Sequence, residues 1–269
     1  QGATLRFESA LNFEQILDFL LMGVKGGVSG VQQGATTAYL WTFAPSLTAS
    51  NAQNAYTFQY GDDQQAFQVA FAMVRNLELV VPMNAVATVR AELFARYPTK
   101  VSFTVTPTTP TIEDVVGSKA QVYIDPSWAT LGTTAKSTLL IDATLRLPTG
   151  VGPIKYADNS LDFSTFKELP RAMEVELLMA GGADAITEYD NWVTGALRFI
   201  RLKLNGSLIE GAYSRYIQAD MALRYTRPPE IYGGESAGEN VVRLVGRTFV
   251  DPTSGSDFAI AVMNNLASV

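Results

Sequence analysis

The chain lacks cysteine and histidine entirely across its 269 residues. Without cysteine it has no disulfide, no thiol nucleophile and no thiolate ligand for a metal ion. Without histidine it has no serine–histidine triad and no imidazole general base. These two absences exclude most common enzyme mechanisms, so we expect a protein that is not an enzyme and that carries no cofactor or metal site.

Basic residues and long apolar segments are also scarce. Lysine and arginine number 20 against 26 aspartates and glutamates, which gives a net charge of −6 and a pI near 4.8. Tight binding to DNA or RNA needs clustered basic residues. The acidic charge therefore argues against tight binding, although weak contact with nucleic acid is still compatible with it. No run of eighteen apolar residues occurs, and the sequence therefore predicts no membrane span.

Apolar residues are plentiful, at 47% of the chain, and their spacing indicates a mainly β protein with one or two flanking helices, an α+β class. A helical period predicts helices over 13–24 and 184–197. Alternating apolar and polar residues predict strands elsewhere. The predicted strands cover 36–43, 55–61, 66–81, 87–97, 138–147, 160–166, 172–179, 198–206, 215–226, 240–250 and 257–266.

A short sequence pattern occurs twice in the chain with weak similarity between its two copies. Tyr60, Asp62, Phe67, Arg75 and Glu78 each recur 96 residues further along the chain, without a gap. The repetition predicts a tandem duplication, with domains at 1–105 and 119–269, each containing two packed antiparallel sheets or a half-barrel. The alternative is that two hairpins merely look alike.

Two segments rich in proline, glycine and polar residues separate the strand patterns. Residues 106–118 carry two prolines and several threonines and are expected to form a connector or an extended arm outside the core. An ordinary loop between strands is the alternative for this segment. Residues 227–240 are expected to form a second long loop.

Acidic residues supply the candidate site. Glu174 and Glu176 alternate with apolar residues, so both carboxylates leave the same face of a strand, and Glu78 is the counterpart of Glu174 in the first half. A pair of carboxylates could serve a glycosidase, but nothing in the sequence distinguishes an acid from a nucleophile. We interpret Glu78, Glu174 and Glu176 as surface charge.

The order of these elements resembles the tail tube proteins of long, flexible-tailed bacteriophages. The resemblance is carried by the glycine-ended helix at 12–27, by Tyr39, Trp41, Phe43 and Pro45 in the next strand, and by the segments 60–62, 77–79, 199–211 and 216–225. It implies a β-sandwich or half-barrel whose copies form stacked rings around a hollow channel. A duplicated chain would form trimeric rings with pseudo-sixfold symmetry, whereas an unduplicated one would form hexamers.

The same resemblance implies the partners and the place of action. The chain would contact copies of itself, a tape measure protein and the terminator and initiator proteins of the tail, in the virion and, during assembly, in the host cytoplasm. Double-stranded DNA would pass through without tight binding, along a lumen bearing Glu78, Glu174 and Glu176. The alternatives are another β-sandwich virion component, such as a baseplate, capsid-decoration or pilus-like protein, and a carboxylate-dependent hydrolase.

Overall fold

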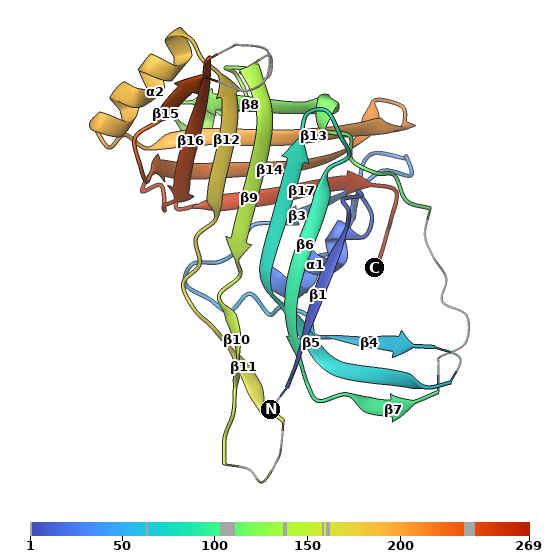
Figure 1. Cartoon of the computed structure of the whole chain (residues 1–269). Helices are drawn as coiled ribbons and strands as arrows, with labels where there is room; N and C mark the ends of the chain where they lie inside the picture. Colours follow the sequence, from blue (N-terminus) through green and yellow to red (C-terminus); the bar gives the residue numbers. More distant parts are fainter. Residues whose placement is uncertain are drawn as a thin grey trace.

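The computed structural model describes residues 2–62, 64–102, 111–136, 139–157, 159, 162–233 and 240–269. This part of the chain is mainly β with two α-helices at its flanks, which confirms the predicted fold class (Figure 1). The helices are α1 (Ile16–Gly23) and α2 (Ala183–Val193), and short 3-10 turns lie at Gly117–Lys119 and Trp128–Thr130.

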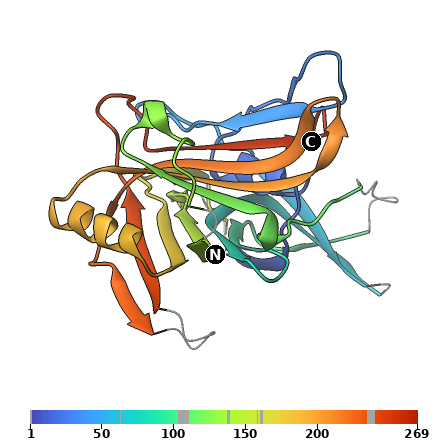
Figure 2. The same ribbon diagram turned by 90° about the horizontal axis from the view of Figure 1, so that it is seen from above.

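The strands form two layers, and all the pairings within them are antiparallel. The first layer contains, in order across the sheet, β1 (Ala3–Ala10), β6 (Thr88–Ala95), β5 (Ala66–Pro82), β9 (Leu140–Pro148), β12 (Glu174–Ala180), β16 (Asn240–Thr248) and β15 (Glu230–Gly233). The second contains β8 (Ala120–Asp125), β13 (Arg198–Glu210), β14 (Tyr213–Tyr225), β17 (Phe258–Asn264), β3 (Tyr39–Phe43) and β2 (Val31–Gln32). The strands of the second layer run across those of the first (Figures 1 and 2).

One strand joins the two layers. The last residues of β14, Leu223 to Tyr225, pair with the end of β16 in the first layer, while an earlier stretch of β14 pairs with β17 in the second. The sheet is therefore continuous and folds back on itself. Its inward side chains pack together with those of α1 and form the core. They include Leu77, Leu79, Leu145 and Leu147 from the first layer, Leu202, Leu204 and Ile217 from the second, and Ile16 and Leu20 from α1.

A smaller β region extends from one end of the first layer (Figure 1). It is made of β4 (Tyr56–Gly61), the first half of β5, β7 (Thr99–Val101) and the hairpin of β10 (Val151–Ile154) and β11 (Thr165–Glu168). The strand β5 changes partners near Phe71, whose φ of 57° lies in a region that few residues other than glycine adopt. This conformation accompanies a shift of register against β4, so one long strand serves both regions.

The two copies of the repeated sequence pattern lie in similar local arrangements of strands. The first begins in the β4–β5 hairpin and ends with Glu78 in the first layer, and the second begins near the β10–β11 hairpin and ends with Glu174 in the first layer. However, strands of the two predicted domains pair directly, β5 with β9 and β17 with β3. Residues 1–105 and 119–269 therefore share one sheet and one core.

The predicted arm at 106–118 is described only from residue 111, because 103–110 lie outside the described residues. Val115 is fully buried, contrary to the expectation that this segment stays outside the core. Isolated bridges join Asp114 to Asn12 and Val116 to Val86. In the second predicted loop, 234–239 also lie outside the described residues, and Glu230–Gly233 form β15 instead of an irregular excursion.

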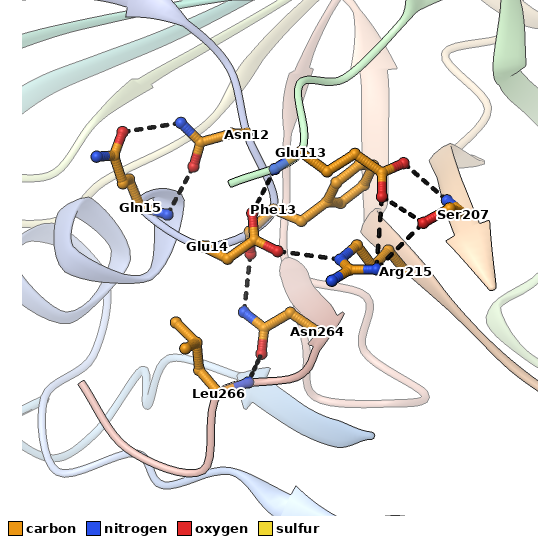
Figure 3. A network of polar contacts seen from close by, with 9 residues as sticks. All are labelled: Asn12, Phe13, Glu14, Gln15, Glu113, Ser207, Arg215, Asn264 and Leu266. Atoms are coloured by element: carbon orange, nitrogen blue, oxygen red, sulfur yellow. Dashed lines mark hydrogen bonds and ion pairs between the residues drawn. The ribbon is translucent and has the colours of Figure 1, made fainter. Parts of the chain in front are cut away.

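A polar network fastens the described end of this segment to the body of the protein (Figure 3). The buried carboxylate of Glu14 accepts hydrogen bonds from Arg215 Nε and from the Glu113 backbone N–H, both at 3.0 Å. Glu113 in turn accepts from the Ser207 backbone N–H at 2.8 Å. The entry to α1, the 111–118 segment and the β13–β14 turn are thereby held together, and the buried charge of Glu14 is compensated.

Candidate functional site: the charged face of the first layer

The outward face of the first layer carries all three glutamates named from the sequence. Glu78 lies in β5, and Glu174 and Glu176 lie in β12, with β9 between these two strands. Arg146 of β9 is directly opposite Glu78 on one side and Glu174 on the other. Because strand residues alternate between faces, the register places these side chains on the face away from the core.

Ion pairs connect this face from strand to strand. Arg90 of β6 binds Glu8 of β1 at 3.0 Å and Glu78 of β5 at 3.4 Å. Arg146 of β9 binds Glu78 at 2.8 Å and Glu176 of β12 at 3.2 Å. Arg243 of β16 lies 3.2 Å from Glu176. We call these six residues, which alternate in charge across six neighbouring strands, the charge row: Glu8, Arg90, Glu78, Arg146, Glu176 and Arg243.

The surroundings of the row affect its charges. A hydrogen bond to Glu8, followed by one to Glu78, raises the pKa of Arg90 above its ordinary value. Burial lowers the pKa of Arg146, but its hydrogen bonds to Glu176 and Glu78 outweigh this effect and leave the pKa raised. Asp142, four residues from Arg146 on the same face of β9, has its pKa raised by burial and then by the nearby Glu176 carboxylate. Both arginines therefore stay charged at any physiological pH.

The row differs from the predicted acidic surface. Glu78 and Glu176 each contact two arginines, so their charges are largely balanced. Among the described residues, Glu174 forms no ion pair, although Arg146 and Arg247 lie opposite it on the neighbouring strands. The arginines were missed in the sequence, where the same alternation that singled out the glutamates also marks Arg90 and Arg146 as outward-facing.

A shallow, open groove of 690 Å³ crosses this face, and its lining includes Arg6, Glu78, Arg90, Arg146 and Glu174. Glu78, which lines the groove, pairs with Arg90 and Arg146, whereas Glu174, which also lines it, forms no ion pair among the described residues. Within the described ranges, no group of three or more aspartates and glutamates is placed to hold a metal ion. The arrangement can present balanced charge to a polyanion but offers it few unpaired cations.

The described helices include none that is long and apolar enough to cross a membrane. No protein-family model and no curated protein matches the chain.

Proposed function

We propose that the protein is a structural subunit of a phage tail tube, whose copies associate into stacked rings around a channel for DNA. The observation that carries this proposal is the first layer itself. It is a broad antiparallel sheet with one face packed on the core and the other covered by the charge row. A wall around a DNA channel needs a polar face that does not hold phosphates, and a sheet of this kind can supply one.

The edges of the first layer favour association between copies. In the described part of the chain, β1 pairs only with β6, and β15 on the opposite side pairs only with β16. An edge strand leaves a row of backbone N–H and C=O groups open to another strand. If β1 of one copy continues the sheet beyond β15 of the next, the contact is head-to-tail, and repetition closes a ring when the rotation between copies is a whole-number fraction of a full turn.

The charge row favours passage of DNA over binding. An arginine that already contacts two carboxylates has less to gain from a phosphate, and the neighbouring carboxylates repel the DNA backbone. Of the six residues in the charge row three are acidic and three basic, so the row itself carries no net charge. The tape measure, terminator and initiator proteins remain the partners implied by the resemblance, and the virion tail remains the implied location.

Electron microscopy of the concentrated protein, with sedimentation velocity on the same sample, tests the proposal. Rings or tubes are expected. Three chains in each ring would support both the tube and the tandem duplication. Six chains in each ring would support the tube and contradict the duplication. A monomer that stays compact at every concentration would contradict self-association and favour another β-sandwich component of the virion.

The charge row makes a separate prediction about DNA. In the double variant Glu78→Gln with Glu176→Gln, Arg90 and Arg146 lose carboxylate partners and become available to phosphates. We expect the variant to bind a 20-base-pair duplex with an affinity that falls steeply with salt, as counterion release requires. Fluorescence anisotropy measures this binding, and the wild-type protein should show none at physiological salt.

The matched control is Glu210→Gln, which removes an exposed carboxylate that bonds Thr37, away from the charge row. This variant changes net charge by half as much but should not bind the duplex. Equal binding by the control, or tight binding by the wild-type protein, would contradict the role given to the charge row.

A further inference from the structure

The helix α2 faces the sheet with the buried Glu188 and with the half-buried Trp192, which packs against the core. Glu188 is 5% exposed and accepts hydrogen bonds from Arg198 at 2.7 and 2.9 Å and from the Tyr225 hydroxyl at 2.7 Å. Burial, and then the Glu188 carboxylate, raise the pKa of Tyr225 well above its usual value, so the phenol keeps the proton that it donates. A second ion pair, Lys136 with Asp184, holds the first turn.

The opposite side of α2 is apolar and open to solvent. Ile186 is 62% exposed, Tyr189 41% and Val193 62%. These residues follow the i, i+3, i+7 spacing of one helix face, and we call them the ridge. A surface helix normally turns such a face toward the core, so an apolar face directed outward indicates a contact with another molecule.

An open groove of 830 Å³ lies at another place on the surface. Its walls come from residues 46–51, 165–171 and 248–250, and we call it the apolar groove. Four exposed apolar side chains line it: Leu47, Leu169, Phe249 and Val250. The 46–51 wall is fixed by Glu168, which accepts hydrogen bonds from the Asn51 backbone and side-chain nitrogens at 3.1 and 3.0 Å.

The ridge and the apolar groove lie at opposite ends of β12. The groove residues reach Arg171, just before β12 begins at Glu174, and α2 begins at Ala183, just after β12 ends at Ala180. Seven residues of extended strand span about 20 Å. Figure 1 shows α2 beyond one end of β12 and the β10–β11 hairpin beyond the other.

We propose that the ridge of one copy docks in the apolar groove of a second copy stacked along the direction of β12. The occupant is a second copy because one chain carries exposed apolar side chains on a projecting helix at one end of β12 and, within a groove of otherwise mixed lining, at the other end. Such a contact is head-to-tail and leaves a free ridge and a free groove at the ends of every stack, so it extends without closing. This inference rests on the proposed function and names the contact between its rings.

Cysteine cross-linking tests this contact directly, because the natural chain contains no cysteine. We would prepare Val193→Cys on the ridge and Leu169→Cys in the apolar groove, and oxidise each alone and in a mixture. Both positions are exposed, so neither change should disturb folding. A cross-linked dimer is expected from the mixture and from neither variant alone. Leu208→Cys, an exposed position near the end of β13, replaces either partner as the control and should give no cross-linked dimer.

A second substitution tests whether the ridge itself makes the contact or whether the two cysteines are merely close to each other. Ile186→Asp, added to Val193→Cys, places a charge on the ridge and should reduce the mixed dimer by at least about tenfold. Thr187→Asp adds the same charge at an exposed neighbouring position and should leave the yield of dimer unchanged. Equal effects of the two aspartates would overturn the role of the ridge.

Electron microscopy of the same samples separates this inference from the proposed function. A mixed dimer without rings or tubes would uphold the contact and remove the tube. Rings or tubes without a mixed dimer would support the tube and overturn the contact between ridge and groove. A dimer formed equally well by Val193→Cys alone would also overturn this contact. Absence of both would overturn both.

Discussion

The two helices of this protein are attached to the sheet in opposite ways. In α1, Ile16, Leu17, Leu20 and Leu21 are buried against the core, and the helix is held by apolar contact. In α2, Glu188 is the buried member, and the apolar residues Ile186 and Val193 face solvent. One helix is therefore anchored by the hydrophobic effect, and the other by a buried ion pair together with the half-buried apolar residue Trp192.

The difference teaches that an apolar stripe predicts a helix without predicting which way the stripe faces. Both stripes have helical spacing in the sequence, and both segments are helical in the structure. An inward stripe stabilises the monomer, whereas an outward one can only stabilise a contact with something else. The two helices should accordingly respond differently to the same kind of substitution.

The largest effect is expected at Glu188. Replacing Glu188 with alanine leaves the Arg198 guanidinium half-buried without its carboxylate and the Tyr225 hydroxyl without its acceptor. Removing one partner of a buried ion pair costs about 3–5 kcal/mol of unfolding free energy. Urea denaturation measures this loss. Asp190→Ala, at an exposed position of the same helix, is the control and should change little, and a loss as small in Glu188→Ala would show that apolar contacts hold α2 after all.

The corresponding change in α1 is Leu17→Ala. Leu17 is fully buried, so the substitution removes apolar contact and leaves a cavity in the core. The expected loss is about 2–5 kcal/mol of unfolding free energy, measured by the same denaturation. If the loss were under about 1 kcal/mol, α1 would not be the core helix that its burial indicates.

A smaller effect, dependent on pH, is expected at Glu168. Its charged carboxylate anchors a loop, as the carboxylate of Glu188 anchors a helix. Burial raises the pKa of Glu168, but hydrogen bonds from Asn51 and Ser50 outweigh it and leave the pKa below its ordinary value of 4.5. The charged form is therefore favoured in the folded state. Its contribution to stability is fully present above pH 4.5 and is lost as the pH falls through the lowered pKa.

Comparison of the wild-type protein with Glu168→Gln isolates this contribution from the other carboxylates. The unfolding free energies of the two should differ most near pH 7, and the difference should shrink as the pH falls through the lowered pKa of Glu168, because the glutamine does not titrate. A difference that is constant over this range would mean that the carboxylate charge has no part in fixing the 46–51 loop.

Much of the fold follows from local pattern, and most of the site depends on pairing that local pattern does not contain. Period-two alternation predicts β5, β9 and β12, and it also places Glu78 and Glu176 on outward faces. It does not reveal that β9 lies between β5 and β12. Arg146 could therefore not be identified from the sequence as the residue that pairs with both Glu78 and Glu176. Likewise, Val115 follows a proline-rich segment that predicts exposure, and its burial comes from pairing with distant residues: its N–H donates to the Leu11 carbonyl and its carbonyl accepts from the Ala87 N–H, both at 2.8 Å.

The smallest effect on stability is expected on the ridge, at Ile186→Ala. This side chain is mostly exposed in the monomer, so its truncation should change the unfolding free energy by no more than about 0.5 kcal/mol. The same truncation in α1 is expected to be several times more costly, although isoleucine and leucine remove similar apolar area. Denaturation should be measured at a protein concentration low enough that sedimentation velocity shows monomer, because association would add its own stabilisation. A loss as large as that of Leu17→Ala under these conditions would mean that the ridge packs within its own chain and that the contrast between the two helices does not hold.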